Sequence, residues 1–120
     1  MTDKLTPRQL AGRVALAASD RKASDIKVLH IEHLTVLADY FVICTGNVTT
    51  HVRAIVDEIE LKMKEEYGIY PISMEGYASS NWVLIDYGSV VAHVFLEDTR
   101  SFYSIERLWG DAPRVEIEGI

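Results

Sequence analysis

The run DYFVICTG at residues 39–46 constrains the fold more than any other stretch of the sequence. It is almost continuously apolar, and it ends in Thr-Gly. A strand with one face in water alternates apolar and polar residues, whereas a strand that is covered on both faces carries an unbroken apolar run. We therefore predict that this run is a strand buried on both faces.

The N-terminal segment carries a complete start signal for a helix. Thr6 suits the N-cap, Pro7 suits the first helical position, and Gln9 completes a capping box with Thr6. The predicted apolar side of this helix, at helical spacing, consists of Leu10, Val14 and Ala17.

A second helix is predicted directly after the apolar strand. We expect Thr49 or Thr50 to cap its N-terminus. Gly68 is expected to end it, because glycine readily adopts the left-handed conformation found at helix C-termini. Its predicted apolar stripe consists of Val52, Ile55, Val56, Ile59 and Met63.

Most of the remaining chain is predicted to form strands. Strands are expected at 25–31 and 70–76, and WVLIDYGSVVAHVF at 82–95 is expected to form a hairpin with its turn at 87–89. A last helix is predicted to start at Thr99. Its expected buried face contains Phe102, Ile105 and Leu108 or Trp109.

The resulting order, α-β-β-α-β-β-β-α, predicts an α/β fold on the border with α+β. Because β-α-β connections and a hairpin coexist, we expect a single-layer mixed sheet of about five strands flanked by helices. Residues 1–120 are expected to form a single domain, with 110–120 as a tail of no firm structure.

Composition limits the classes of function. The formal net charge of −6 disfavours binding to a nucleic-acid backbone, and it suits a basic protein partner, a cation or plain solubility. The single cysteine, Cys44, excludes an intrachain disulfide and a zinc site built from several cysteines. No apolar run is long enough to cross a membrane and the N-terminus has no signal core, so a cytoplasmic protein is expected.

The stretch CTGNVTTH at residues 44–51 allows two interpretations. A glycine turn between a strand and a helix can cradle a phosphate group, because free N–H groups and the helix dipole face the anion. With Gly46 in that role, the protein would be a small metal-dependent nucleotidyltransferase or phosphotransferase. The stretch lacks the glycine patterns of phosphate-binding loops, so an ordinary strand-to-helix turn is the favoured interpretation.

The acidic and histidine residues show no catalytic pattern. Glu58 and Glu60 have the spacing of a metal-binding carboxylate pair on a strand, but they lie on a predicted helix, where they diverge. His93 is expected to be a packed, hydrogen-bonded core group rather than a base. Cys44 lies in an apolar strand, where a thiol is inert. We therefore expect no catalytic residue, no metal site and no cofactor.

The first strand of the hairpin is the remaining candidate for a binding site. Trp82, Leu84 and Asp86 share one face of this strand, and Val83 and Ile85 share the other. One face is expected to pack on helices and the other to be open. Trp82 is thus either a core residue or the aromatic anchor of a protein interface. Acidic residues expected at the rim of such an interface are Glu75, Asp86 and Asp98.

Four blocks of the sequence, in this order and spacing, closely resemble the ribosomal silencing factor family, also called the Iojap-like family. They are DYFVICTGNVTTHVRAIVDEI, the pair EG at 75–76, WVLIDYGSVVAHVF and RSFYSIERLW. The likeness runs from about Asp25 to Trp109, which is most of the chain. The chain departs from the family pattern after CTG, where Asn47 and Val48 stand in place of a small polar residue.

The resemblance implies a translation repressor that catalyses no reaction. Proteins of this family bind the large ribosomal subunit through the basic ribosomal protein uL14 and block its joining with the small subunit, which slows protein synthesis when nutrients are short. Their fold is similar to that of nucleotidyltransferases without the metal-binding aspartates. Members of the family often form homodimers.

The resemblance also implies which residues contact the partner. Trp82 matches the family's tryptophan before the hairpin and is expected to be the apolar anchor, with Tyr103 as a second contact. Leu84 and Tyr87 are further candidates on the hairpin. The acidic residues expected to pair with Lys or Arg of the partner are Glu75, Asp86 and Asp98. The rival enzyme hypothesis predicts magnesium-dependent nucleotide binding, and direct RNA binding is disfavoured by the charge.

Overall fold

The structure, a computed structural model, describes residues 5–103, 107 and 109–120, with the backbone alone at 101–103. Its elements follow the predicted order: α1 Pro7–Asp20, β1 Ser24–His30, β2 Tyr40–Gly46, α2 Thr49–Tyr67, β3 Ser73–Glu75, β4 Trp82–Asp86, β5 Val90–Leu96 and α3 Glu97–Tyr103. No helix within these ranges is long and apolar enough to span a membrane.

The five strands form one mixed sheet in the order β1-β2-β5-β4-β3. β2 and β5 are parallel, and the other neighbouring strands are antiparallel. A parallel pair needs a long connection, which α2, β3 and β4 provide, whereas β4 and β5 need only the turn at 87–89. All seven residues of β2 are buried. The structure thus confirms the mixed five-stranded sheet and the strand buried on both faces.

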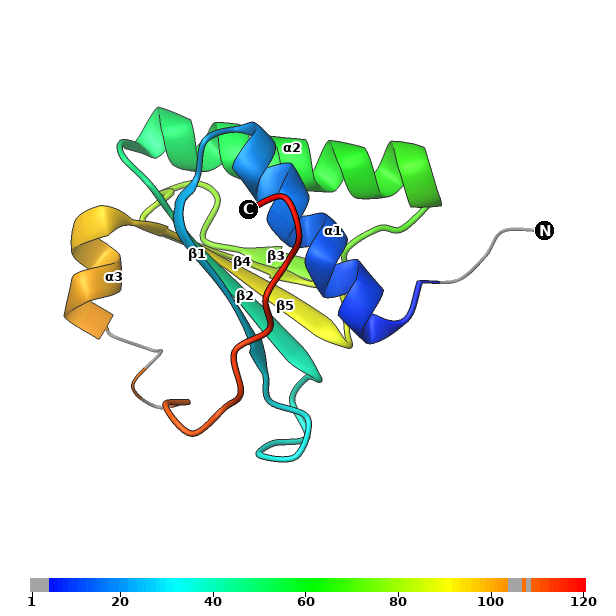
Figure 1. Cartoon of the computed structure of the whole chain (residues 1–120). Helices are drawn as coiled ribbons and strands as arrows, with labels where there is room; N and C mark the ends of the chain where they lie inside the picture. The colour runs from blue at the N-terminus through cyan, green and yellow to red at the C-terminus, as the bar shows by residue number, and fades with distance from the viewer. Residues whose placement is uncertain (1–4, 104–106, 108) are drawn as a thin grey trace.

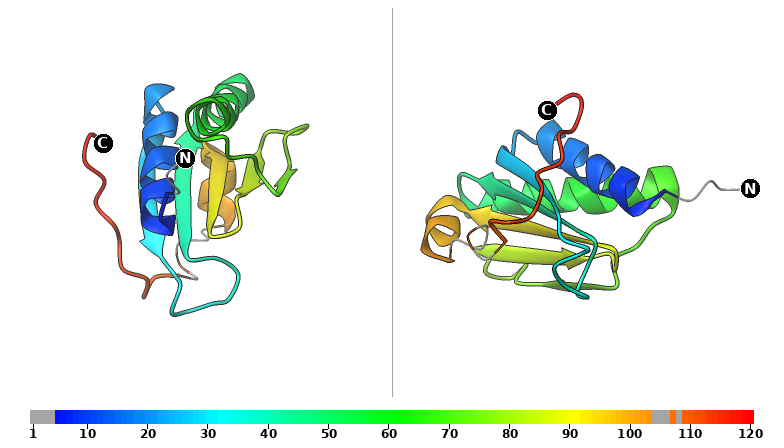
Figure 2. Two further views of the ribbon diagram at one scale, coloured as in Figure 1. Left: turned by 90° about the vertical axis from the view of Figure 1, so that its right-hand side faces the viewer. Right: turned by 60° about the horizontal axis from the view of Figure 1, so that its bottom comes forward.

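Both long helices cover the same face of the sheet (Figure 1 and Figure 2). The capping box between Thr6 and Gln9 is formed at the start of α1. Gly68 ends α2 in the left-handed conformation, with φ of 65°. The apolar stripes predicted for the two helices are buried, and they belong to one core cluster with Val83 and Ile85 of β4. The helix-facing side of the hairpin is therefore the side that carries Val83.

The opposite face of the sheet carries a second, smaller apolar cluster, most of which is buried. We call this side the open face only because neither long helix covers it. Its central residues come from β2, β4 and β5: Phe41, Ile43, Trp82, Leu84, Val91, His93 and Phe95. The β1–β2 connection adds Ile31 and Ala38 to this cluster. α3 contacts β2 and β5 at one end of the sheet, and within the described ranges no long helix covers the rest of this face.

The start of α2 differs from the prediction. Its N-cap is Val48, which makes no side-chain capping bond, and Thr49 and Thr50 lie inside the helix. In a usual N-cap, a side chain before the helix accepts from a backbone N–H of the first turn; here a side chain of the first turn accepts from a backbone N–H before the helix. Nδ1 of His51, in the first turn of α2, accepts a hydrogen bond from the Asn47 N–H over 2.9 Å. A helix side chain therefore holds the preceding loop, and the threonine caps expected from the sequence are absent.

Two further elements differ in their bounds. The strand expected at 70–76 is reduced to Ser73–Glu75, because Pro71 has no N–H to donate and Gly76 turns the chain away with φ of 85°. The last helix begins at Glu97 instead of Thr99. Acidic residues at 97 and 98 suit a first helical turn, where the dipole favours negative charge. The side chains predicted for its buried face at 102, 105 and 108 lie outside the described residues.

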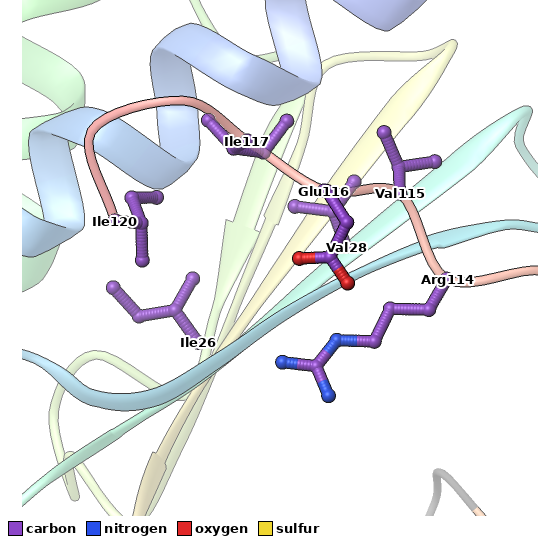
Figure 3. Close-up of a pocket in the computed structure, with 7 residues that line it drawn as sticks. All are labelled: Ile26, Val28, Arg114, Val115, Glu116, Ile117 and Ile120. Carbon is purple, nitrogen blue, oxygen red and sulfur yellow. The ribbon is translucent and has the colours of Figure 1, made fainter.

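The C-terminal segment, residues 109–120, has no helix or strand of its own, yet it lies along the outer edge of β1 (Figure 1). The His30 N–H donates to the Pro113 carbonyl over 2.9 Å, and the Val115 N–H donates to the Val28 carbonyl over 2.8 Å. Val115 is buried in the helix-side core. A small cavity of about 50 Å³ lies between this segment and the side chains of Ile26 and Val28. Figure 3 shows the residues that line it.

Candidate functional site

Trp82 lies at the start of β4, on the open face, where it is half-buried. It is the direct partner of Phe95 in the β4–β5 ladder, and the two rings stack with centroids 4.9 Å apart and an angle of 24°. Its indole Nε1–H donates to Nδ1 of His93 over 3.1 Å. Phe95 thus stacks on the indole and His93 accepts from its only polar atom, so contacts from β5 fix the orientation of the ring.

His93 is only 5 % exposed and packs against the aromatic residues of the open face. Because Nδ1 accepts from Trp82, the ring proton of the neutral form lies on Nε2, which is buried and has no hydrogen-bond partner. Burial lowers the pKa of His93 from 6.5 to about 4. The imidazole is therefore neutral at physiological pH, as a packed, hydrogen-bonded core residue would be.

The register of the sheet places Glu75, Leu84 and His93 in one row across three strands. Glu75 pairs with Leu84, and Leu84 pairs with His93. Directly paired residues point to the same side of a sheet, so all three lie on the open face. Glu75 is exposed and Leu84 is half-buried. The structure thus brings Trp82, Leu84 and Glu75 together on one surface, with an acidic residue at its outer edge.

Trp109 is a component of this surface that the sequence patterns assigned to a helix face. It follows α3 and meets Phe41 of β2 edge-on, with ring centroids 5.5 Å apart. Phe41 in turn meets the ring of His93 at 4.6 Å. The open face therefore has an aromatic floor that runs from Trp82 through His93 and Phe41 to Trp109. Helical periodicity cannot reveal this contact, because Trp109 lies beyond the helix.

The structure does not bring Tyr87 to this surface. Its side chain is 8 % exposed and belongs to the helix-side core, and burial raises the pKa of its hydroxyl. Asp86 is half-buried at the far end of β4, where its Oδ1 accepts from the Gly88 N–H over 2.7 Å and so shapes the hairpin turn. Asp86 thus stabilises the hairpin turn, and Tyr87 packs in the helix-side core.

The two candidates on α3 follow the end of β5 that lies away from the hairpin turn, where Phe95 pairs with Trp82. Asp98 is exposed and lines a cavity of about 370 Å³ between the start of α3 and the start of α2. Lining residues from the α2 side are Asn47, Val48 and Thr49. The side chain of Tyr103 lies outside the described residues, although its backbone ends α3.

Gly76 is a positioning residue for Trp82. Its φ of 85° favours glycine, and a Cβ at this position would overlap the carbonyl oxygen of Trp82. The loop after Gly76 is held against α2, because the Tyr77 hydroxyl donates to the Asp57 carboxylate over 2.9 Å and Arg53 donates to the Ala78 carbonyl over 3.2 Å. The close approach of two backbone segments thus fixes where β4, and with it the indole, begins.

The glycine turn at the end of β2 has a structural role. A Cβ on Gly46 would come within 2.8 Å of Cγ2 of Val52, so glycine lets the first turn of α2 pack tightly on the strand. The Asn47 N–H, which a phosphate cradle would leave free, donates to His51. The other ring nitrogen of His51 bonds to the Arg21 carbonyl over 2.7 Å. The backbone of this turn is therefore engaged within the fold.

The described residues contain no group of three or more His, Cys, Asp or Glu side chains that could hold a metal ion. The Cys44 thiol is fully buried, and burial raises its pKa to about 12. It is therefore an inert component of the core. The chemically distinctive feature of the described chain is the aromatic open face and its acidic edge.

Comparisons with known proteins agree on one family. The family model described as "Ribosomal silencing factor during starvation" matches residues 4–120. The ribosomal silencing factor of Halalkalibacterium halodurans is 46% identical over 104 residues, which is 87% of this chain and 88% of that protein. A crystal structure of a Chromobacterium violaceum protein superposes with a TM-score of 0.85 at 32% identity, covering 95% of this chain and 93% of that one.

A more distant relative comes from the mouse. It is named mitochondrial assembly of ribosomal large subunit protein 1, and it is 34% identical over 90 residues, which is 72% of this chain and 39% of that protein.

Proposed function

The chain belongs to the ribosomal silencing factor family, and we propose that it represses translation by binding the large ribosomal subunit through ribosomal protein uL14. Bound there, it blocks joining with the small subunit sterically and slows protein synthesis when nutrients are limiting. The family places the chain among ribosome-associated regulators of translation. The choice of uL14 as partner and of steric blocking as mechanism follows the family resemblance, and it needs no catalysed reaction.

The observation that carries the proposal is the state of Trp82 on the open face. The indole is half-buried, yet Phe95 and His93 already hold its orientation. Binding therefore needs little further ordering of this side chain, and a rigid aromatic ring at the centre of an interface is a typical hot spot. Trp82 packs against the second apolar cluster and stays half-buried, whereas Val83 and Ile85 are fully buried on the helix side.

Charge supports a basic protein as the partner. Glu75 is exposed next to Leu84, and the whole chain carries a net charge of −6. An acidic edge around an apolar centre complements a basic surface, and it repels the phosphate backbone of RNA. We infer that the docking surface consists of Trp82 and Leu84 at its centre and Glu75 at its rim. The name of the mouse relative, which refers to the large subunit, agrees with this target.

The test is sedimentation of the purified protein with isolated large subunits, isolated small subunits and joined ribosomes. The wild type should sediment only with free large subunits. Trp82→Ala should lower the affinity by roughly thirtyfold, as the loss of a central anchor does. Leu61→Ala on α2, where the leucine is 47% exposed on the other side of the molecule, is the matched control and should bind normally.

Trp82→Phe separates the role of the ring from that of its N–H group. Phenylalanine can still stack on Phe95, but it cannot donate to His93, so we expect a loss of affinity between those of the wild type and Trp82→Ala. Absence of the wild type from every ribosomal fraction would reject the proposed function. Unchanged binding by a folded Trp82→Ala protein would move the contact to another surface.

We also propose that two copies of the chain can pair through the same face, and that this homodimer competes with binding to the large subunit. If two copies pair through Trp82, then raising the protein concentration should favour dimers and Trp82→Ala should remain monomeric. Light scattering across a concentration series measures this directly. Dimers that persist in the Trp82→Ala protein would assign self-association to a different surface.

A further inference from the structure

The β1–β2 loop, residues 31–39, exposes an apolar tip that the sheet face does not explain. We propose that this tip is a second, preformed anchor that inserts into an apolar recess on a protein partner whose rim carries Lys and Arg. The inference rests on the proposed function, because it takes that partner to be the large-subunit protein that docks on the open face.

Exposure of the tip is unusual for side chains of this kind. Leu34 is 42% exposed, Leu37 is 69% exposed and Val36 is 102% exposed, within four consecutive residues. A single exposed apolar side chain is common, but a group of three at one projecting point is typical of a surface that a partner covers. Figure 1 shows the loop projecting from the end of the sheet, away from α1 and α2.

The loop has a defined conformation rather than an open one. The Ile31 N–H donates to the Asp39 carbonyl over 2.9 Å and closes its neck. The Leu34 N–H donates to the Ile31 carbonyl over 2.8 Å, and the Leu37 N–H donates to Oγ1 of Thr35 over 3.1 Å. These bonds hold the tip in place before any partner arrives, so binding loses less conformational entropy.

The base of the loop continues the open face. Ile31 is fully buried and Ala38 is 5% exposed, and both pack in the same cluster as Phe41. The neck is also tied to the hairpin turn, since the Asp39 N–H donates to the Ser89 carbonyl over 2.8 Å. The base of the loop therefore belongs to the buried cluster of the open face. The exposed tip projects at the end of the sheet where the hairpin turns, and Trp82 pairs with Phe95 at the other end, so a partner that contacts both must span this face.

Charge around the tip selects the class of partner. Glu32 and Asp39 flank it, and the sequence has no Lys or Arg between Lys27 and Arg53. An apolar loop that inserts into an anionic membrane needs nearby Lys or Arg side chains, and residues 31–39 contain neither. Two copies of a chain with net charge −6 would bring acidic residues together at such a contact. A basic-rimmed protein recess satisfies both the apolar tip and its acidic flanks.

The experiment compares wild type with the double variant Val36→Ser/Leu37→Ser in equilibrium binding to purified large subunits. Both residues are exposed, so the variant should keep the urea unfolding midpoint of the wild type. We expect its affinity to fall by roughly tenfold or more. Val48→Ser is the matched control, because Val48 is 57% exposed in a different loop, and it should bind as the wild type does.

The outcomes separate this inference from the proposed function. Wild-type binding with no loss in the double variant would overturn the second anchor and leave the proposed function standing. No binding by the wild type would overturn both. Loss of self-association in light scattering without loss of subunit binding would assign the tip to a second copy, and binding to phosphatidylserine vesicles that the variant loses would assign it to lipid; each result would overturn the proposal.

A second variant tests the preformed geometry. Thr35→Ala removes the oxygen that accepts from the Leu37 N–H but leaves the apolar side chains in place. We expect a several-fold loss of affinity for large subunits, smaller than that of the double variant, because the tip must then order on binding. Affinity equal to that of the wild type would contradict a role for the preformed turn.

Discussion

The indole Nε1–H of Trp82 donates to Nδ1 of His93 over 3.1 Å, across the two strands of a single hairpin. The bond places the imidazole under the open face as a support for the indole. It also decides the tautomer of His93 and leaves Nε2–H without a partner in the core. His93, which the sequence offers as a candidate base, thus serves to orient the neighbouring Trp82.

His93→Phe tests this support. The change removes the acceptor for the indole and also removes the unpartnered Nε2–H, and each effect is worth about 1 kcal/mol with opposite sign. We expect the free energy of unfolding in urea to change by less than about 1 kcal/mol, while affinity for large subunits falls. In a Trp82→Phe background the same change should have no further effect on affinity. Additive losses would contradict the coupling.

The stability of the protein should depend on pH through His93. Burial lowers its folded pKa from 6.5 to about 4, so between these values the unfolded chain binds a proton that the folded chain does not. The stability contributed by this group is complete above pH 6.5 and is lost as the pH falls towards 4, by roughly 3 kcal/mol. Urea unfolding of wild type and His93→Phe across this window should show the difference, and identical pH profiles would contradict it.

Gly76→Ala should destabilise the fold and disturb Trp82. The left-handed φ of 85° and the overlap with the Trp82 carbonyl together should cost about 2 kcal/mol or more. Gly68→Ala is the matched control, since its φ is 65° and no atom lies within 4 Å of the new Cβ, so only strain of about 1 kcal/mol is expected. Urea unfolding and Trp fluorescence measure both effects. Equal losses of unfolding free energy in the two variants would contradict the close approach of Gly76 to the Trp82 carbonyl.

Tyr87→Phe should leave ribosome binding unchanged. The hydroxyl is buried without a hydrogen-bond partner on the helix side of the sheet, so its removal should be neutral or stabilise the protein by about 1 kcal/mol. Co-sedimentation with large subunits and urea unfolding are the measurements. A clear loss of affinity with normal stability would show that Tyr87 reaches the partner after all.

Deletion of residues 113–120 should weaken the fold at β1. It removes the two backbone bonds to Val28 and His30 and uncovers apolar surface over Ile26. An uncovered strand edge promotes pairing with another chain, so we expect a lower unfolding midpoint and association that rises with concentration. Deletion of Ile120 alone, which is 52% exposed, is the control and should change little. A monomeric, fully stable truncated protein would contradict a covering role.

Much of the fold could be predicted because its signals are local. The Thr6–Gln9 capping box, the Gly68 terminator and the unbroken apolar run of β2 each act through neighbours a few residues away. Such signals set the type and order of the elements. They failed at the start of α2, where the bond between Asn47 and His51 replaces a threonine cap.

The candidate site was predictable only in part. The period of β4 separates Trp82 from Val83 in the sequence, but which of the two faces the helices depends on how α1 and α2 pack. Tyr87 follows the same hairpin and yet lies in the helix-side core. Trp109 and the C-terminal segment contact the sheet from beyond the last helix, so the periodicity of a helix or strand does not predict these contacts.

The sequence by itself determined the order of the eight elements, the acidic net charge and the family to which the chain belongs. The tertiary structure alone decided which side of the sheet faces away from the two long helices, which aromatic residues meet there, and that an apolar loop tip projects at one end of the sheet. The physical reason is the distance along the chain over which each kind of interaction acts. Backbone propensity, capping and periodicity act within a turn or a strand, whereas a binding surface is made by residues such as Phe41, Trp82 and Trp109, which meet only when the whole chain has closed around its core.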